Sequence, residues 1–312
     1  MVKKKKLLIT GVAGFVGSKV ASRFINEGFD VFGIDNLSSG KLQNIPKDLD
    51  FKKADLSDKK IYDKIPKNFD VILHLAGQSS GEKSFYNPED DLKKNTLSTL
   101  NIIKHGINCR SKKIIYASSM SVYGNIGNKP ASEKMICNPI SCYGISKLTS
   151  EKYLNIFKNK LPFISLRMFN VFGYGQDMNN LKQGMVSIYL AQAIKNNIIN
   201  VKGSINRLRD FIYIDDVVEA WFRSTVNKIR LNQVLNLGTG TKTSVKKLLQ
   251  TICEEIKGCK YKVKNGTPGD QKFIYSNNLQ LKQQLKLKKF IKINRGIRLF
   301  VSELKRKNNS FR

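Results

Sequence analysis

Three evenly spaced glycines constrain the fold of this chain more than any other feature of its sequence. A strand-like apolar run, LLIT, precedes them, and a segment typical of a helix follows. The glycines are Gly11, Gly14 and Gly17. In such a strand–turn–helix unit the first glycine permits a sharp turn, the second lets the backbone approach a phosphate, and the third lets the helix pack on the strand. The dipole and free N–H groups at the helix N-terminus face the anion. The spacing predicts a dinucleotide site, and a glycine triplet in an ordinary loop is the alternative.

The first half of the chain alternates short apolar runs with longer polar segments, which is the pattern of βαβ units. Strands are predicted at 7–10, 30–34, 50–53, 71–75, 113–117 and 163–168. Helices are predicted near 17–27, 89–106 and 143–159. Right-handed crossovers between parallel strands follow from this order. We therefore expect an α/β fold, with a Rossmann-like doubly wound parallel sheet.

The pattern changes from about residue 173. A Gly-, Asn- and Gln-rich loop leads into an amphipathic stretch at 184–196, and the Lys-rich tail at 282–312 is typical of a possible helix with a frayed end. We expect the second half to form a smaller, partly interleaved C-terminal substrate domain. The dinucleotide-binding domain would comprise residues 1–172 and 205–240, and the substrate domain residues 173–204 and 241–312.

Carboxylates end the second and third predicted strands. Asp35 lies about 20 residues beyond the glycines, where it can accept hydrogen bonds from the adenosine ribose and repel a 2′-phosphate. This position favours NAD over NADP, although an Asp in the sequence DNLSSG is also a common turn former. Asp55 can accept a hydrogen bond from the adenine amine, or it can cap a helix. His74, after a buried strand, is expected to pack beneath the cofactor loop.

A second polar cluster lies at the end of the strand in IIYASSMSVYG at 114–124, where open parallel sheets place their ligands. Ser119 is the candidate from this cluster. Tyr143 and Lys147 follow at the head of a predicted helix, and their spacing places the phenol and the ammonium on one face. A tyrosine pKa is ordinarily about 10, and the ammonium together with a positive nicotinamide ring would favour the phenolate. The pair predicts a general base; an ordinary helix with an aromatic residue and a solvated lysine is the alternative.

In this order the motifs resemble the extended short-chain dehydrogenase/reductases, in particular the NAD-dependent sugar-nucleotide epimerase/dehydratase family. The resemblance covers nearly the whole chain. It rests on TGVAGFVG at 10–17, DNLSSG at 35–40, HLAG at 74–77, Asn95, SSMSVYG at 118–124, YGISK at 143–147, LRMFNVFG at 166–173, RDFIYIDDVV at 209–218 and NLGTG at 236–240. It implies that Ser119, Tyr143 and Lys147 are catalytic and that the cofactor is NAD. The implied NAD site comprises the three glycines, Tyr143 and Lys147 with Phe15, Val16, Asp35, Asn36, Asp55, Leu56, Leu75, Ala76, Gly77, Asn95 and Phe169.

The same resemblance implies that Asn170 and Arg209 hold the diphosphate of a nucleotide sugar. An amide and a guanidinium are suitable donors to a diphosphate. A loop-capping role for Asn170 and an ion pair of Arg209 with Asp210 or Asp216 are the alternatives.

The chain departs from the family pattern in the segment NGTPGDQ at 265–271. Family members usually carry an arginine shortly before the Gly-Asp pair, where this chain has Thr267. Asp270 is kept, and we expect it in the substrate site. Arg207 or a nearby lysine could take the place of that arginine, but a compact ammonium does not reproduce the fork of a guanidinium.

Met120 indicates which reaction to expect. Dehydratases and decarboxylases of this family carry an acidic residue immediately after the active serine or threonine, and this chain has Met120 there. We therefore expect 4-epimerisation of a nucleotide sugar of the UDP-glucose/UDP-galactose type, with hydride leaving C4 for NAD⁺ and returning to the other face. A nucleotide-sugar 4-keto reductase or a dehydratase of the same family is the alternative.

The formal net charge of +31 favours anionic partners without saying which. Some relatives of this fold resemble RNA-binding proteins that have lost the catalytic groups, and that non-catalytic function is a further alternative. Because this sequence keeps the serine, tyrosine and lysine, we expect a UDP-sugar partner and no nucleic acid.

The longest apolar runs are strand-sized, far from the roughly 20 residues of a membrane span, so no membrane partner is expected. The five cysteines form no CxxC pair, which favours free thiols in the cytoplasm and no metal site. Since such enzymes are often dimeric, a homodimer is expected. Helices 89–106 and 143–159 could form its interface, and packing of these helices within one chain is the alternative.

Overall fold

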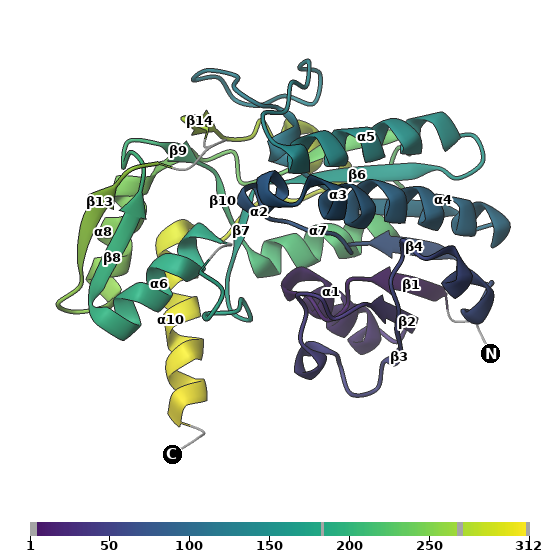
Figure 1. The fold of residues 1–312 in the computed structure, drawn as a ribbon, viewed down its shortest axis with the longest axis horizontal. Helices are drawn as coiled ribbons and strands as arrows, with labels where there is room; N and C mark the ends of the chain where they lie inside the picture. The colour runs from purple at the N-terminus through teal and green to yellow at the C-terminus, as the bar shows by residue number, and fades with distance from the viewer. Residues whose placement is uncertain (1–4, 182–183, 267–270, 310–312) are drawn as a thin grey trace.

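Figure 1 shows a twisted sheet with helices on both faces and a smaller group of elements beside it, in a computed structural model that describes residues 5–181, 184–266 and 271–309. The sheet has seven strands, in the order β11-β6-β5-β4-β1-β2-β3, and its neighbouring strands pair in parallel. The strands are β1 (Lys6–Thr10), β2 (Asp30–Asp35), β3 (Asp50–Lys53), β4 (Val71–His74), β5 (Lys113–Ser119), β6 (Phe163–Met168) and β11 (Gln233–Leu237). This order is that of doubly wound dinucleotide-binding folds, so the predicted Rossmann-like α/β class is confirmed.

Helices cover the sheet and build the smaller part. They are α1 (Phe15–Asn26), α2 (Gly81–Tyr86), α3 (Pro88–Leu92), α4 (Ser98–Asn108), α5 (Cys142–Phe157), α6 (Met185–Asn196), α7 (Ile214–Val226), α8 (Val245–Glu255), α9 (Leu279–Leu285) and α10 (Ile293–Asn309). Short strands complete the fold: β7 (Asn170–Phe172), β8 (Ile198–Lys202), β9 (Leu208–Arg209), β10 (Phe211–Tyr213), β12 (Thr243–Ser244), β13 (Lys260–Lys264) and β14 (Phe273–Ile274).

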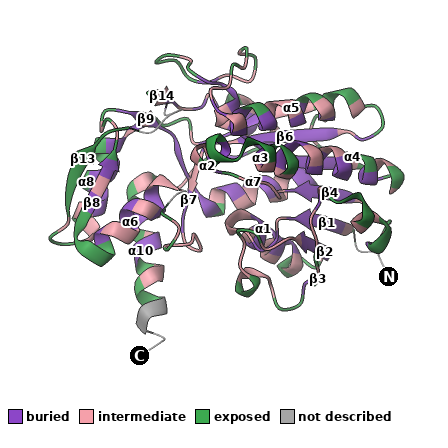
Figure 2. Ribbon diagram, in the orientation of Figure 1, coloured by how far each residue is buried: buried purple, intermediate pink, exposed green. Residues whose placement is uncertain are grey.

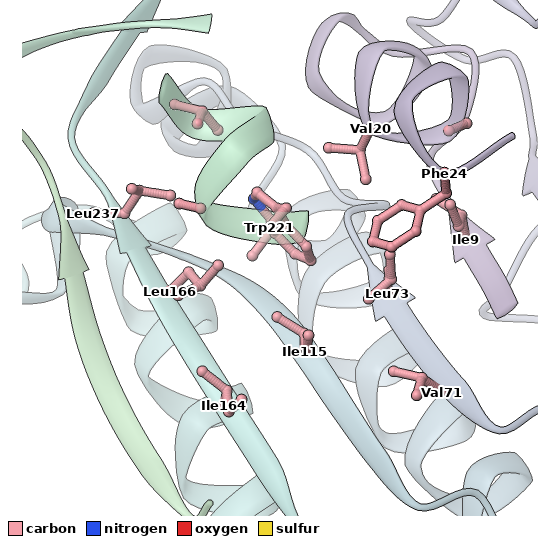
Figure 3. Close-up of a cluster of buried hydrophobic side chains, with 14 of the residues drawn as sticks. Ile9, Val20, Phe24, Val71, Leu73, Ile115, Ile164, Leu166, Trp221 and Leu237 are labelled. Atoms are coloured by element: carbon pink, nitrogen blue, oxygen red, sulfur yellow. The ribbon is translucent and has the colours of Figure 1, made fainter. Parts of the chain in front are cut away.

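The sheet is buried on both faces, because successive side chains of a strand point to opposite sides. Ile9 of β1 belongs to a core shared with α1 and α7, whereas its neighbour Leu8 belongs to the core shared with α4 and α5. Figure 3 shows the first core, with Trp221 of α7 near the strand that carries Leu166 and Phe24 of α1 beside Leu73. In Figure 2 the central strands are correspondingly purple. Strands covered on both sides leave only their ends free to bind ligands.

A third core holds the smaller part together. Leu190 of α6, Leu248 of α8 and Phe300 of α10 pack there with Ile199 of β8. The chain enters this part after β6, returns to the sheet through β10, α7 and β11, and then leaves it again. The second half is therefore interleaved with the sheet, as the sequence predicts, while the exact domain boundaries stay a prediction.

Two predicted helices differ from the structure. The predicted helix 89–106 is a helical run that contains a π-helical turn, Lys93–Leu97, between α3 and α4. The helix predicted within 282–312 is shorter than that range, because this segment contains the end of α9 and the separate helix α10, Ile293–Asn309. Lys286 ends α9 with a φ of 54°, and a residue in this left-handed region stops a helix.

A buried ion pair fixes α5 to β6. Arg167 donates from Nε and Nη2 to the two carboxylate oxygens of Glu151, over 3.0 and 2.7 Å. Both side chains are 5% exposed, and Ser165 Oγ donates to the same carboxylate over 3.1 Å. Because α5 begins with the predicted catalytic residues, this pair fixes their position relative to the strand ends.

Replacing Glu151 with glutamine is expected to destabilise the protein by about 3–5 kcal/mol, because the Arg167 guanidinium then stays buried without its counter-charge. Thermal unfolding should show a midpoint lower by on the order of 10 °C. The matched control is Glu255→Gln, since Glu255 pairs with an Arg298 side chain that is 74% exposed and such surface pairs contribute at most about 1 kcal/mol. Equal midpoints for the two variants would contradict the structural role of Glu151.

Candidate active site

A cleft of about 610 Å³ lies along the carboxyl edge of the sheet. Its lining includes residues that follow β1 to β5, the start of α1, and on the opposite wall the segments 174–178 and 184–187. Open α/β sheets bind their ligands at this edge. The sequence-predicted residues that line the cleft are Gly11, Gly14, Phe15, Val16, Gly17, Asp35, Asn36, Asp55, Leu56, Leu75, Ala76, Gly77, Ser119, Tyr143, Lys147, Phe169 and Asn170.

The glycine-rich turn has the geometry that its spacing predicts. Gly11 has a φ of +75°, and a Cβ there would lie 2.7 Å from the backbone nitrogen of Ala76. A Cβ on Gly17 would collide with the carbonyl oxygen of Gly11, so α1 can approach β1 only with glycine at this position. Gly14 is the N-cap of α1. The N-terminus of α1 therefore lines the cleft, and neither Gly11 nor Gly14 adds a side chain in front of it, which suits the pyrophosphate of NAD.

Two carboxylates stand at the other end of the cofactor half of the cleft. Asp35 accepts hydrogen bonds from the N–H groups of Ala13 (3.0 Å) and Leu37 (2.8 Å), while burial raises the pKa of its carboxyl. Burial would also raise the pKa of Asp55, but hydrogen bonds from Ser57 and Asn36 outweigh it and lower that pKa. Because Asn36 Nδ2 lies 3.0 Å from Asp55 Oδ2, the ends of β2 and β3 are joined. The pair is placed as an adenosine site requires, so the described residues fit NAD at both ends.

Ser119, Tyr143 and Lys147 meet in the middle of the cleft. Ser119 ends β5, and its hydroxyl forms a hydrogen bond that lowers the pKa of Tyr143. Lys147 Nζ donates to the carbonyl oxygen of Ala117 over 2.9 Å and lies 5.7 Å from the centre of the Tyr143 ring. Ser141 caps α5 by accepting from Gly144 N–H over 3.1 Å. The cap and the strand end thus place a hydroxyl, a phenol and an ammonium around one point.

Burial sets the protonation of this trio. It raises the pKa of Tyr143 to about 12, an effect that Ser119 opposes and Asp91 reinforces. It lowers the pKa of Lys147 to about 8, against the charges of Asp91 and Glu151. The protein alone therefore keeps the phenol protonated at neutral pH. The group that lowers the pKa of Tyr143 in this structure is Ser119, and a lowering by Lys147 together with a positive nicotinamide ring stays a prediction.

His74 lies beneath this trio and is fully buried. Its Nδ1 is 2.8 Å from Thr10 Oγ1, and its Nε2 is 3.0 Å from Thr99 Oγ1. Burial, with the charge of Lys147, lowers the pKa of His74 to about 3. The neutral imidazole links β1, β4 and α4 by hydrogen bonds. This is a structural role, in agreement with the prediction that His74 packs beneath the cofactor loop.

Two described residues that the sequence predicts for the site, Asn95 and Arg209, do not line the cleft. Asn95 is buried behind the loop after β4, where its Oδ1 faces Gly77. Arg209 is 4% exposed in β9, where its Nη1 donates to the Leu208 carbonyl over 2.9 Å. Asp270 lies outside the described residues, as does Thr267.

Asn170 has the loop-capping role that is the alternative to diphosphate binding, and it also lines the cleft. Its Nδ2 donates to the carbonyl oxygen of Asp210 over 2.9 Å, which holds the loop. The Asp210 carboxylate accepts hydrogen bonds from Thr239 N–H (2.9 Å) and Gly240 N–H (3.0 Å). It therefore stabilises the turn after β11. The contacts of Asn170 and Arg209 with a diphosphate stay predictions.

The far wall of the cleft has no counterpart among the residues predicted from the sequence. Lys41, after β2, and Asp177, after β7, both line the cleft, and Lys41 Nζ lies 3.0 Å from Asp177 Oδ1. Two loops distant in sequence therefore meet across it. Neither loop has a periodic pattern, so no signal in the sequence could pair them.

The described part of the chain contains no group of three or more His, Cys, Asp or Glu residues able to hold a metal ion. Within the same described ranges, no helix combines the length and the apolar character that crossing a membrane requires. The observed chemistry of the cleft is that of hydroxyl, phenol, ammonium and carboxylate groups.

Comparison with known proteins agrees with this geometry. The sequence model of the NAD dependent epimerase/dehydratase family matches residues 7–238. The UDP-glucose 4-epimerase of Mycolicibacterium smegmatis is 32% identical over 260 residues, which are 80% of this chain and 82% of that protein. The structure of the Thermotoga maritima UDP-glucose 4-epimerase with UDP-glucose is similar with a TM-score of 0.92 at 31% identity, covering 97% of this chain and 99% of that one. For the Thermus thermophilus UDP-glucose 4-epimerase with NAD, the TM-score is 0.88 at 28% identity, with 96% and 99% covered.

Proposed function

Because the chain belongs to the NAD dependent epimerase/dehydratase family of enzymes, we propose that it inverts C4 of a UDP-sugar of the UDP-glucose/UDP-galactose type. The reaction is a transient oxidation at C4, after which hydrogen returns to the opposite face of the sugar. The family uses NAD, and the cleft has the glycine turn and the carboxylates that this cofactor requires.

Met120 is the observation that carries this choice among the reactions of the family. It lines the cleft directly after Ser119, and its sulfur lies 3.5 Å from Asn170 Nδ2. Among the described lining residues the carboxylates are Asp35, Asp55 and Asp177. The first two lie at the adenosine end and the third pairs with Lys41. Elimination of water from a sugar needs an acid and a base near C5 and C6, and a thioether supplies neither.

The side chains of this chain perform the proton chemistry. NAD, when bound, supplies the reversible oxidation at C4. Tyr143 accepts the proton of the C4 hydroxyl and later returns it, while Ser119 donates a hydrogen bond to the same oxygen. The Lys147 ammonium stabilises the phenolate by its charge. The nicotinamide and Tyr143 serve both half-reactions from one side of the sugar. The 4-keto sugar therefore has to turn over in the cleft between the two half-reactions, so that its other face receives the hydrogen.

The nucleotide sugar is proposed to contact both predicted domains, since Asn170 and Arg209 fall in the dinucleotide-binding ranges and Asp270 falls in 241–312. Asn170 at the cleft, Arg209 in β9 and Asp270 are the proposed contacts. Asn170 supports this assignment because it begins β7 and lines the cleft beside Met120.

The test is incubation of the purified protein with UDP- and dTDP-sugars, followed by NMR of the products. Inversion at C4 with no net production of NADH is the expected result. A 4-keto-6-deoxy product would indicate a dehydratase, and stoichiometric consumption of NAD(P)H would indicate a reductase. Salt-sensitive RNA binding by a protein that takes up no NAD would favour the non-catalytic alternative.

We propose that the enzyme is a homodimer. Ile145 and Ile156 of α5 are 53% and 70% exposed, and Leu92 of α3 is 56% exposed. We propose that these side chains are covered in the dimer as one apolar patch, the kind of surface that marks protein interfaces, so Ile156→Glu is expected to convert the dimer to a monomer in sedimentation velocity experiments. Ile136→Glu is the control, because Ile136 is 90% exposed outside these helices. A monomeric wild-type protein would contradict the proposal.

A further inference from the structure

A buried carboxylate lies in the wall behind the catalytic lysine. Asp91 of α3 is fully buried. One of its oxygens, Oδ1, accepts hydrogen bonds from Gln78 Nε2 (2.8 Å) and Asn95 Nδ2 (2.9 Å). The other oxygen, Oδ2, is buried without a hydrogen-bond partner among the described residues. Both donors are neutral amides, so they orient the carboxylate without neutralising it.

The nearby lysine needs such a charge. Lys147 is 3% exposed, and its ammonium donates a hydrogen bond to a neutral carbonyl, that of Ala117. Moving an ammonium out of water favours loss of its proton unless a negative charge lies close by. Burial accordingly lowers the pKa of Lys147, while the charges of Asp91 and then Glu151 raise it.

The other groups that face Lys147 supply less of this charge than Asp91, or none. Glu151, one turn along α5, is held by both arms of the Arg167 guanidinium. His74 from β4 is neutral, since burial lowers its pKa to about 3. Tyr116 from β5, whose ring centre is 5.0 Å from Lys147 Nζ, and Tyr143 have pKa values that burial raises. Of the two carboxylates that raise the pKa of Lys147, Glu151 is therefore paired with Arg167, whereas Asp91 has no cationic partner among the described ion pairs.

The π-helical turn, Lys93–Leu97, carries the residue that links Asp91 to the loop beside Lys147. The turn follows α3 directly and carries Asn95, whose Nδ2 holds Asp91. A Cβ placed on Gly77 would collide with Asn95 Oδ1 and lie 3.3 Å from Lys147 Nζ. Asp91 is therefore hydrogen-bonded to Asn95, and the side chains of Asn95 and Lys147 lie on the same side of Gly77, all three buried.

We propose that Asp91 is a positioning residue of the reaction, because its carboxylate is the counter-charge that keeps Lys147 protonated beside Tyr143. Asp91 touches neither sugar nor cofactor and acts through the lysine. The inference rests on the proposed function only where it takes Tyr143 as the general base. Loss of the carboxylate would narrow the pH range over which the phenolate is stabilised.

The first test is the pH profile of kcat for C4 inversion by NAD-saturated enzyme. In Asp91→Asn the side chain keeps its shape and can still accept from Gln78. Removing the negative charge favours the neutral amine, so the alkaline limb of the profile is expected to move down by about one pH unit, with activity retained near pH 6. Asp91→Glu keeps the charge and is expected to restore the wild-type limb.

The matched control is Asp90→Asn, which makes the same change in net charge one residue earlier. Asp90 is 38% exposed and pairs with Lys94 over 2.8 Å, so its replacement should leave the limb in place. If Asp91→Asn and Asp90→Asn have the same alkaline limb as the wild type, the proposal is wrong.

The second test needs no activity. Thermal unfolding of Asp91→Asn, Lys147→Met and the double variant forms a double-mutant cycle. Each single change leaves one buried charge unpaired, so the loss in the double variant is expected to be smaller than the sum of the two single losses. Additive losses would overturn the proposal. Since the cycle is measured without substrate, a failure of the proposed reaction and a failure of this inference can be told apart.

Discussion

Tyr143→Phe is expected to lower kcat for C4 inversion by about 10²- to 10⁴-fold, the usual contribution of a positioned general base. The phenyl ring keeps the packing of a side chain that is 8% exposed, but it has no hydroxyl to take the C4 proton. Bound NAD, measured by absorbance after release from the protein, should stay unchanged. The effect is therefore on the chemical step and not on binding.

Tyr86→Phe is the control for this result, because Tyr86 is 82% exposed on α2. This variant should invert C4 at the wild-type rate. Undiminished inversion by Tyr143→Phe would remove the proposed mechanism. A loss of bound NAD together with activity would instead show that the phenol serves mainly to hold the cofactor.

Gly17→Ala is expected to weaken NAD binding by about 100-fold, as measured by calorimetry. The added methyl group would collide with the Gly11 carbonyl oxygen and lie 2.7 Å from the Gly11 carbonyl carbon. Because both atoms belong to backbone, α1 has to move away from β1, and its N-terminus leaves the pyrophosphate. Overpacking of this kind costs about 1–3 kcal/mol, and about 2.7 kcal/mol corresponds to 100-fold in affinity.

The matched control lies beyond the other end of the same helix. Gly28 has a φ of +79°, and a Cβ there would meet no atom within 4 Å. Gly28→Ala therefore adds backbone strain of about 1 kcal/mol but leaves the turn at the cleft intact. If both variants bind NAD equally well, the close approach of α1 to β1 is not what holds the cofactor.

The strands and the cofactor half of the cleft could be predicted because their signals are local. An apolar run, a glycine turn and a carboxylate at the next strand end lie within short stretches of sequence, and parallel pairing brings those strand ends to one edge. Ser119 and Tyr143 are found in the same way, since each stands at the end or the start of an element. Such residues are placed by the fold class itself.

Residues whose role depends on contacts between distant segments could not be predicted. Asp91 lies in the acidic run PEDD, which suggests a solvated helix start, and only the packing of α3 on α5 shows that one of these carboxylates is buried. The pairing of Lys41 with Asp177 joins two loops. The break after α9 depends on the left-handed backbone of a single residue, Lys286. A lysine does not predict this conformation, because glycine and asparagine are the residues that usually adopt it.

The position of β11 has a consequence for folding during synthesis of the chain. This strand, Gln233–Leu237, pairs in parallel with β6 at the border of the sheet, although more than sixty residues separate the two strands. While the ribosome is still making that intervening stretch, β6 presents an open row of backbone donors and acceptors, and such rows invite mispairing. The nascent enzyme is thus open to mispairing at the edge of β6 until Leu237 has emerged from the ribosome.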